Sequence, residues 1–140
     1  MKRVLDLHIL PQTAEVATAR HSLAVLEDLV SDRSLEQLRL LVTELVTNAV
    51  RHAGLAETDR IGLRVFVSGD TVRVEVEDPG RGFVAPADPE PDSDQISGWG
   101  LYLMASMTDR WGVENRASGK EKRAGEDHRT LVWFELGVAG

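Results

Sequence analysis

The residues from Leu38 to His52 show the hydrophobic spacing of an amphipathic helix. Their apolar side chains fall on one side of a helix with 3.6 residues per turn. These apolar residues are Leu38, Leu41, Val42, Leu45 and Ala49. Glu44, Asn48 and His52 follow one another at intervals of four along the neighbouring stripe, and Arg51 lies at its other edge. A polar line beside the buried edge of a helix indicates a functional site, although many amphipathic helices show such spacing by chance.

Two helices are predicted in the first third of the chain. The first begins at Thr13, which can cap it, and continues to about Val30 with apolar residues on one side. The second is the helix just described. Ser34 followed by Gln37 has the pattern of a capping box and predicts its beginning. Gly54 predicts its end.

Four segments alternate between apolar and polar residues and are predicted to be strands. They are Val4–Leu10, Ile61–Val67, Thr71–Glu77 and Thr130–Leu136. The tripeptide Ser68-Gly69-Asp70 predicts a hairpin turn between the second and third of them. Strict alternation predicts a sheet covered on one face, because a doubly wound parallel sheet would show continuous apolar runs. The two helices are enough to cover that face.

Beyond the third predicted strand the pattern changes. Asp78–Phe83 has the glycine spacing of a tight loop, and Val84–Ser97 combines three prolines with four acids, which is typical of a mobile loop. Gly98-Trp99-Gly100 then begins an apolar helical run that reaches Met107. Arg110–Arg116 is predicted to be a further strand, and the charged, glycine-containing Ala117–His128 to be an exposed hairpin loop.

Length and composition restrict the classes of protein to which this chain can belong. A chain of 140 residues suits one domain, 1–140, and a hydrophobic content of 42% excludes a disordered protein. The absence of cysteine excludes disulfides, a thiol nucleophile and a zinc–thiolate site, and it fits a cytoplasmic protein. No apolar run approaches ~18 residues, so no membrane span is expected. A net charge of −7 disfavours nucleic acids and membranes, and favours a protein or small ligand as partner.

The glycine-containing loops suit a nucleotide. Asp78 ends a strand, and a carboxylate fixed there is a good acceptor for an exocyclic amine such as that of adenine. Gly80 and Gly82 would let the backbone approach a flat ring, although the same residues also describe an ordinary turn. Gly98 and Gly100 at a helix start would offer free N–H groups to phosphate, and a plain glycine loop is the alternative.

The polar residues of the central helix suit the phosphate end of such a ligand. Asn48 can offer its amide oxygen to Mg²⁺, and Glu44 could take a proton from a nucleophile that attacks the γ-phosphate. A surface carboxylate paired with arginine is the alternative for Glu44. Arg51 could balance phosphate charge or be solvated, and His52 could brace the site or cap the helix. Thr130 could hold a water beside the aspartate or simply pack.

These motifs occur together in one order. TELVTNAVRHA is followed by VEDPGRGF, then by GWGLYLM, then by a threonine on the final strand. The order resembles the GHKL ATP-binding fold shared by gyrase, MutL and histidine kinases, over nearly the whole chain from Leu5 to Leu136. In size the chain looks most like the stand-alone anti-sigma-factor serine kinases of bacterial stress and sporulation switches.

The resemblance implies an α+β two-layer sandwich, in which helices cover one face of a mixed, mainly antiparallel sheet. ATP and Mg²⁺ are the implied cofactors, with 84–97 as a mobile lid over the nucleotide. Glu44 would be the catalytic base and Asn48 the metal ligand. The residues implied to bind the nucleotide are Asn48, Arg51, His52, Asp78, Gly80, Gly82, Phe83, Gly98, Trp99, Gly100, Leu101 and Thr130.

The implied function is an anti-sigma factor with serine/threonine kinase activity toward an antagonist protein. Its partners would be a sigma factor, the antagonist, or both. The sequence leaves open whether the chain also forms a homodimer. The segment 84–97 contains no Lys or Arg to meet the γ-phosphate, so a nucleotide-sensing switch without phosphoryl transfer is the alternative. The ATP-binding part of a histidine kinase ranks last, because His21 lacks that family's surrounding residues and no dimerisation helices precede it.

Overall fold

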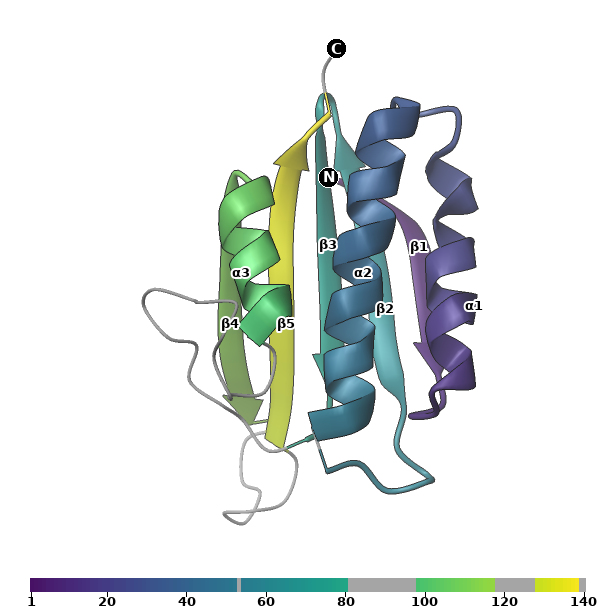
Figure 1. Cartoon of the computed structure of the whole chain (residues 1–140), viewed down its shortest axis with the longest axis vertical. Helices are drawn as coiled ribbons and strands as arrows, with labels where there is room; N and C mark the ends of the chain where they lie inside the picture. The colour runs from purple at the N-terminus through teal and green to yellow at the C-terminus, as the bar shows by residue number, and fades with distance from the viewer. Residues whose placement is uncertain (53, 81–97, 118–127, 139–140) are drawn as a thin grey trace.

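The structure, a computed structural model, describes residues 1–52, 54–80, 98–117 and 128–138. The predicted lid 84–97 and most of the predicted hairpin loop, residues 118–127, lie outside these residues, as do Gly82 and Phe83. Helices form one layer and a sheet forms the other (Figure 1). No helix among the described residues is long and apolar enough to cross a membrane.

The sheet has five strands in the order β1-β2-β3-β5-β4, and every pairing is antiparallel. The strands are β1 (Lys2–Ile9), β2 (Ile61–Ser68), β3 (Thr71–Asp78), β4 (Arg110–Ala117) and β5 (His128–Gly137). Gly69, with φ +54°, occupies the turn between β2 and β3, as the hairpin prediction required. The predicted fold class is therefore confirmed, with a sheet that is wholly antiparallel.

All the helices cover the same face of the sheet (Figure 1). They are α1 (Ala14–Ser22), a 3₁₀ turn η1 (Leu23–Leu26), the long α2 (Asp32–His52) and α3 (Gly98–Met107). The end of α2 is confirmed, since Gly54 just beyond it has φ +65°.

Two predictions of helix boundaries were wrong. The helix expected to reach Val30 ends at Ser22, where the tighter η1 takes over, and the Thr13 side chain makes no capping hydrogen bond. The second helix begins before the predicted capping box. Ser31 caps it, because its Oγ accepts the backbone N–H of Ser34 at 3.1 Å. Ser34 is thus the third residue of the helix instead of its cap.

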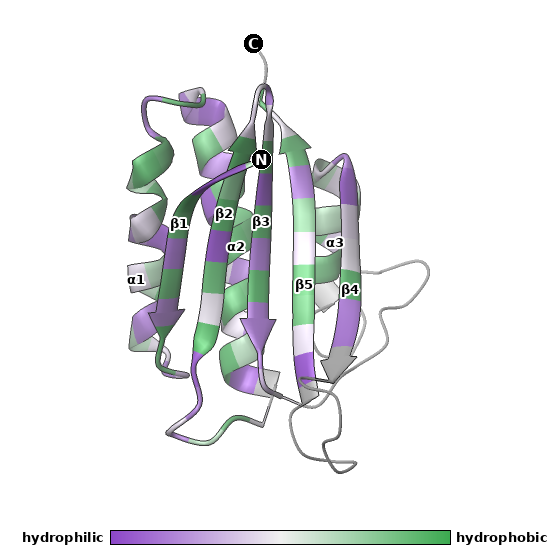
Figure 2. Cartoon of the chain, turned by 180° about the vertical axis from the view of Figure 1, so that it is seen from behind, coloured by the Kyte–Doolittle hydropathy of each residue, from purple (hydrophilic) through white to green (hydrophobic). Residues whose placement is uncertain are grey.

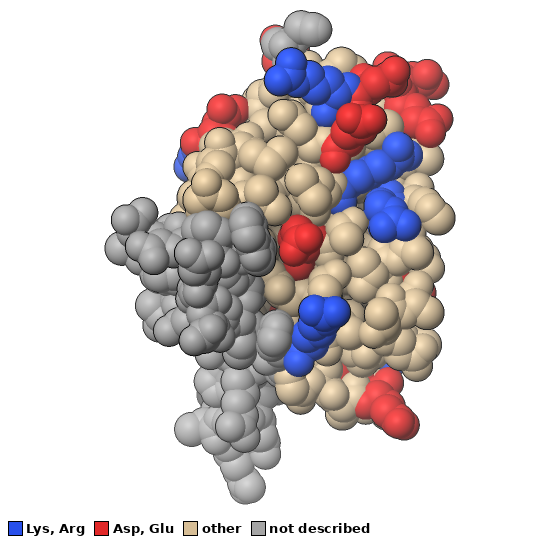
Figure 3. Space-filling model, in the orientation of Figure 1, with Lys and Arg blue, Asp and Glu red and all other residues tan. Residues whose placement is uncertain are grey.

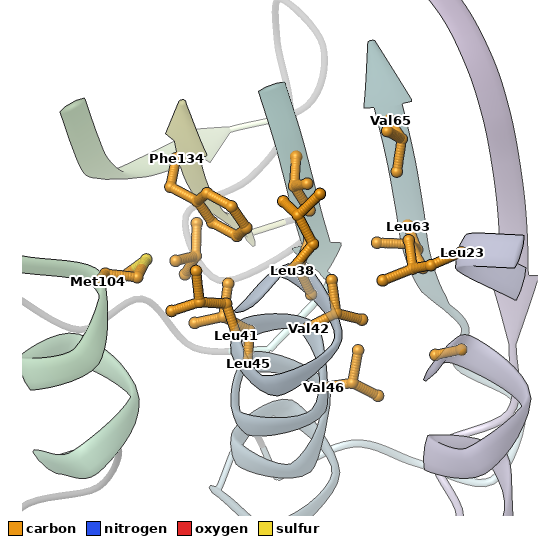
Figure 4. Close-up of a cluster of buried hydrophobic side chains, with 14 of the residues drawn as sticks. Leu23, Leu38, Leu41, Val42, Leu45, Val46, Leu63, Val65, Met104 and Phe134 are labelled. Carbon is orange, nitrogen blue, oxygen red and sulfur yellow. The ribbon is translucent and has the colours of Figure 1, made fainter. Parts of the chain in front are cut away.

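The hydrophobic core lies between α2 and the inner face of the sheet (Figure 4). The apolar side of α2 is buried as predicted, with Leu38, Leu41 and Val42 fully inaccessible to solvent. Phe134 of β5 and Met104 of α3 belong to the same buried cluster. The core therefore fixes α2 and α3 side by side on the sheet, with α2 in contact with β3 and α3 in contact with the edge strand β4.

No described helix covers the outer face of the sheet, and hydrophilic and hydrophobic residues alternate along its strands (Figure 2). Arg73 of β3 pairs with Glu75 and with Glu135, both at 2.9 Å. Its guanidinium lies 4.2 Å from the ring centroid of Trp133 on β5. Ion pairs and this cation–π contact therefore cover a sheet face that solvent reaches.

Several elements meet at one end of the sandwich. The end of β3, the last turn of α2 and the first turn of α3 lie at the same end in Figure 1, where β5 begins. The predicted motifs lie at the ends of these elements. The fold thus brings together residues that are distant in sequence.

Candidate functional site

Asp78 is a buried acid at the end of β3. It continues the inward series of Val72, Val74 and Val76, which explains why a charged side chain is only 6% exposed. Its Oδ1 accepts the backbone N–H of Gly80 at 2.8 Å. Burial raises the pKa of Asp78 to about 6, an increase that the Gly80 hydrogen bond partly opposes and nearby negative charges reinforce.

Thr130 of β5 lies directly opposite Asp78 in the pairing of the two strands. It is 2% exposed, and its buried hydroxyl oxygen has no hydrogen-bond partner among the residues that the structure describes. Asp78 and Thr130 are the buried polar residues of the described part of the chain. A buried hydroxyl without a partner is uncommon, and here it lies beside a carboxylate that faces the same layer.

The first turn of α3 packs on the polar stripe of α2. A Cβ placed on Gly100 would lie 2.6 Å from Nδ2 of Asn48 and 3.7 Å from Cβ of Glu44. Glycine is therefore required at position 100 for the two helices to approach so closely. Asn48 Nδ2 is itself buried and has no hydrogen-bond partner in the described part of the chain. The structure thus brings Glu44, Asn48 and Gly100 together.

The two charged residues on this stripe form no ion pair with any other described residue. Glu44 is half-buried, and no described residue forms an ion pair or hydrogen bond with its carboxylate. The alternative for Glu44, a surface carboxylate paired with arginine, is therefore not found among the described residues. Arg51 is exposed near the end of α2 and likewise has no acidic partner among the described residues.

The remaining predicted site residues divide into three groups. The backbones of His52, Gly98 and Trp99 lie in the last turn of α2 and the first turn of α3. Leu101, in contrast, is 2% exposed and belongs to the hydrophobic core. Gly82 and Phe83 lie outside the described residues, so their placement stays a prediction.

The sequence reasoning missed Asp59. Its negative charge lies close enough to Asp78 to raise the pKa of that carboxyl group. Asp59 is half-buried in the connection before β2, where its Oδ2 accepts the backbone N–H of Ala56 at 2.7 Å. An isolated acid in a polar loop has no periodic signal, so the sequence offered no means of finding it.

The site therefore has two polar regions at one end of the sandwich. One is the buried pair of Asp78 and Thr130, which offers oxygen atoms to an amine. The other is the stripe of Glu44 and Asn48 against Gly100, which offers a carboxylate and an amide. These groups suit the adenine and the metal–phosphate ends of a nucleotide, respectively.

Comparison with known families agrees with this chemistry. The model of the histidine kinase-like ATPase domain matches residues 9–124. The chain belongs to this family. The resemblance to the GHKL fold is thereby confirmed, and ATP is the nucleotide that the name of this ATPase domain family implies.

Curated relatives of this histidine kinase-like ATPase domain are protein kinases. The chain is 36% identical over 91 residues to serine-protein kinase RsbW of Bacillus licheniformis, and the match covers 57% of each protein. It is 34% identical over 94 residues to serine-protein kinase RsbW of Bacillus subtilis, with 59% of each protein covered. The chain thus covers less than two thirds of the length of these relatives.

Solved structures with a similar fold include the blue-light activated histidine kinase of Erythrobacter litoralis. One of its structures is 27% identical with a TM-score of 0.50, covering 78% of this chain and 32% of that one. Its histidine kinase domain is 21% identical with a TM-score of 0.51, covering 93% and 62%. This second likeness concerns the fold alone.

Proposed function

We propose that this chain is an ATP-binding anti-sigma factor that phosphorylates a serine or threonine of an antagonist protein. The observation that carries the proposal is the buried Asp78 carboxylate opposite the partnerless Thr130 hydroxyl, at the end of the sandwich where α2 meets α3. The similarity to serine-protein kinase RsbW supports the choice of a serine kinase. A sigma factor is the second proposed partner. In this proposal residues 1–140 form a single ATP-binding domain, and residues 84–97 form a lid over the nucleotide.

At the adenine end, Asp78 would accept the exocyclic amino group. An ionised carboxylate buried in a low-dielectric site makes a strong, directional acceptor for an N–H donor. The Thr130 hydroxyl would gain the partner that it lacks, either from the base or from a water shared with Asp78. Adenine would then be distinguished from a base that presents a carbonyl oxygen at this position, because two acceptors would repel each other.

At the phosphate end, Asn48 would hold Mg²⁺ and the first turn of α3 would face the phosphates. A bound magnesium ion would withdraw negative charge from the γ-phosphate. The free N–H groups at the start of α3, which has ten residues, suit phosphate oxygens. Gly100 keeps this turn close to Asn48, so that the two groups can act on the same ligand.

Glu44 would act as the general base. Its carboxylate would take the proton of the acceptor hydroxyl as that oxygen forms a bond to the γ-phosphorus. The bond from the γ-phosphorus to the bridging oxygen breaks in the same step, and ADP leaves with the electron pair. The absence of a described ion-pair partner supports this role, because a carboxylate held by arginine would be a weaker base.

A nucleotide-sensing switch without phosphoryl transfer is the second candidate. The observation that favours it is the absence of Lys and Arg from the segment 84–97. Arg51, exposed near the end of α2, is the described cation nearest in sequence to Asn48. In this alternative the chain would bind ATP and hold its partner, and hydrolysis or transfer would be negligible.

The test separates binding from transfer. Calorimetry with Mg-ATP should give a 1:1 complex for the wild type and for Glu44→Gln, and a much weaker one for Asp78→Asn. Transfer of radiolabelled phosphate to a purified antagonist protein should be lost in Glu44→Gln. Glu36→Gln, an exposed acid two turns earlier on α2, is the matched control and should transfer normally.

Each alternative result has its own consequence. Binding without transfer by the wild type would select the switch. Equal transfer by Glu44→Gln and by the wild type would remove Glu44 from catalysis. Unchanged ATP affinity in Asp78→Asn would overturn the proposed nucleotide site itself.

A further inference from the structure

Helix α3 is unusual for a helix at the surface of this chain. Charged residues make up 28% of the sequence, yet the ten residues of α3, GWGLYLMASM, include none. Its residues at the spacing of one helical face are Leu103 and Met107, which pack in part against the core and stay partly accessible to solvent, and Ser106, which is exposed. A surface helix ordinarily carries charged residues on its outer side. This face therefore has the composition of one that a partner covers.

The outward side of α2 has the same character beside α3. Leu40 is 43% exposed, and Thr43 and Thr47 are half-buried at helical spacing from it. Exposed single leucines are common, so Leu40 alone indicates nothing. Its continuity with other uncharged side chains on two adjacent helices is the informative feature.

Charges on the middle of α2 are few. Between Glu36 and Arg51 the helix carries two charged residues, Arg39 and Glu44. Arg39 pairs with Glu27 at 3.8 Å. Glu44 is therefore the charge of this stretch that has no ion-pair partner within the described ranges of the chain. Figure 3 shows the helical layer with broad uncharged areas between small groups of charged side chains.

Glu44 connects the two uncharged surfaces. Its Cβ lies 3.7 Å from the position of a Cβ on Gly100, so it stands where α2 and α3 meet. Leu40 lies one turn before it and Thr47 three residues after it on α2. A protein whose hydroxyl gives its proton to Glu44 must therefore contact these neighbouring residues of α2 and α3.

We propose that this surface docks the protein that carries the acceptor hydroxyl, which rests on the proposed function. We call it the helical docking face, formed by Leu40, Thr47, Leu103, Ser106 and Met107. The centres of protein interfaces are depleted in charge because burying a charge there without a partner is unfavourable. The acceptor protein would therefore present apolar and uncharged groups around its serine or threonine. Its binding would depend weakly on salt.

The test places a charge on this face and on a matched exposed leucine elsewhere. Leu40→Glu alters the face. Leu29→Glu is the control, because Leu29 is 52% exposed and precedes the start of α2. Leu40 lies eight residues into that helix, about 12 Å further along its axis. Both substitutions are at solvent-exposed positions, and circular dichroism would verify folding.

The acceptor is an antagonist protein that the wild type phosphorylates, purified from the same host. Three constants are measured: the Kd for Mg-ATP, the Kd for the acceptor and the KM for the acceptor. Leu40→Glu should raise both acceptor constants at least tenfold and leave the ATP Kd unchanged. Leu29→Glu should change all three less than twofold. A rise in salt from 50 to 500 mM should change the wild-type acceptor Kd less than threefold.

Other outcomes distinguish the two proposals. Wild-type acceptor constants in Leu40→Glu would overturn the docking face and leave the kinase intact. A wild type that binds ATP but neither binds nor phosphorylates any purified antagonist would overturn the kinase proposal, and the docking face with it. A tenfold salt dependence would contradict the uncharged character of the contact.

Discussion

Asp78 and Thr130 face each other across the pairing of β3 with β5, and each is less than a tenth exposed. Strand β3 alternates so that Asp78 takes an inward position that valine holds elsewhere in the strand. Thr130 reaches the same layer from β5 because the two residues are register partners. A carboxylate and a hydroxyl are thus placed side by side in an otherwise apolar layer, where each oxygen interacts more strongly with a ligand than in water.

The affinity for ATP should depend on pH through Asp78. Burial raises the pKa of this carboxyl group to about 6, and only the ionised form accepts both the Gly80 N–H and an adenine amine fully. The Kd for ATP should therefore be constant above pH 7 and rise about tenfold between pH 6 and pH 5. Calorimetry from pH 5 to 8 measures this.

The control for that measurement is Asp78→Asn. The asparagine does not titrate, so its weaker ATP affinity should vary little over the same range. The protonation of ATP itself contributes equally to both proteins, and the variant reports that contribution separately. The same pH profile in both proteins would show that Asp78 is not the titrating group.

Asp78→Asn should also stabilise the protein in the absence of nucleotide. The folded-state pKa of about 6 lies above the ordinary value of 3.8, so this carboxyl group favours the folded state below pH 4. That contribution is lost as the pH rises through 6, and two pK units correspond to about 3 kcal/mol. Urea unfolding at pH 7.5 should show a higher midpoint for the variant, with a difference that shrinks toward pH 4. A less stable variant at pH 7.5 would contradict the assigned cost of burying the ionised acid.

The fold was predictable because its signals are periodic. The strict alternation of β2, β3 and β5 indicated a sheet covered on one side, and the helical spacing of α2 indicated its cover. The boundaries near Thr13 and Ser34 were wrong for a local reason. Capping depends on which hydroxyl accepts a free backbone N–H group of the first turn, and here the Ser31 hydroxyl accepts that of Ser34.

The site was predictable only in part. The order of the motifs indicated which residues belong together, yet no pattern in the sequence shows that Gly100 lies against Asn48 or that Thr130 is the register partner of Asp78. These contacts depend on how distant segments pair in space. The contribution of Asp59 depends on a loop whose course no periodicity describes.

Gly100→Ala should destabilise the contact between α3 and α2. The new Cβ would lie 2.6 Å from Nδ2 of Asn48, so the buried Asn48 side chain must move or one of the helices must shift, at a cost of about 1 to 3 kcal/mol. The Kd for Mg-ATP should rise about tenfold or more, because the first turn of α3 and Asn48 would no longer be in place. Thermal unfolding and calorimetry measure the two effects.

A double-mutant cycle tests the cause of that loss. In an Asn48→Ala background the amide is absent, so Gly100→Ala should cost no stability and should gain the helix propensity of alanine. Additive losses of unfolding free energy in the two single variants would instead show that Gly100 acts independently of Asn48.

Gly112→Ala should reduce stability without affecting the site. Gly112 pairs with Trp133 on the outer face of the sheet, where a Cβ would lie 2.7 Å from the indole Nε1. The ring must move from beneath Arg73, which weakens the cation–π contact and the packing by about 1 to 3 kcal/mol. The midpoint of urea unfolding should fall, while the Kd for ATP stays at the wild-type value because the sheet and the core lie between this face and α2. Gly62→Ala is the matched control on the same face, since its Cβ would meet His8 at an ordinary 3.7 Å and should cost nothing. Equal losses in the two variants would mean that the indole does not require glycine beneath it.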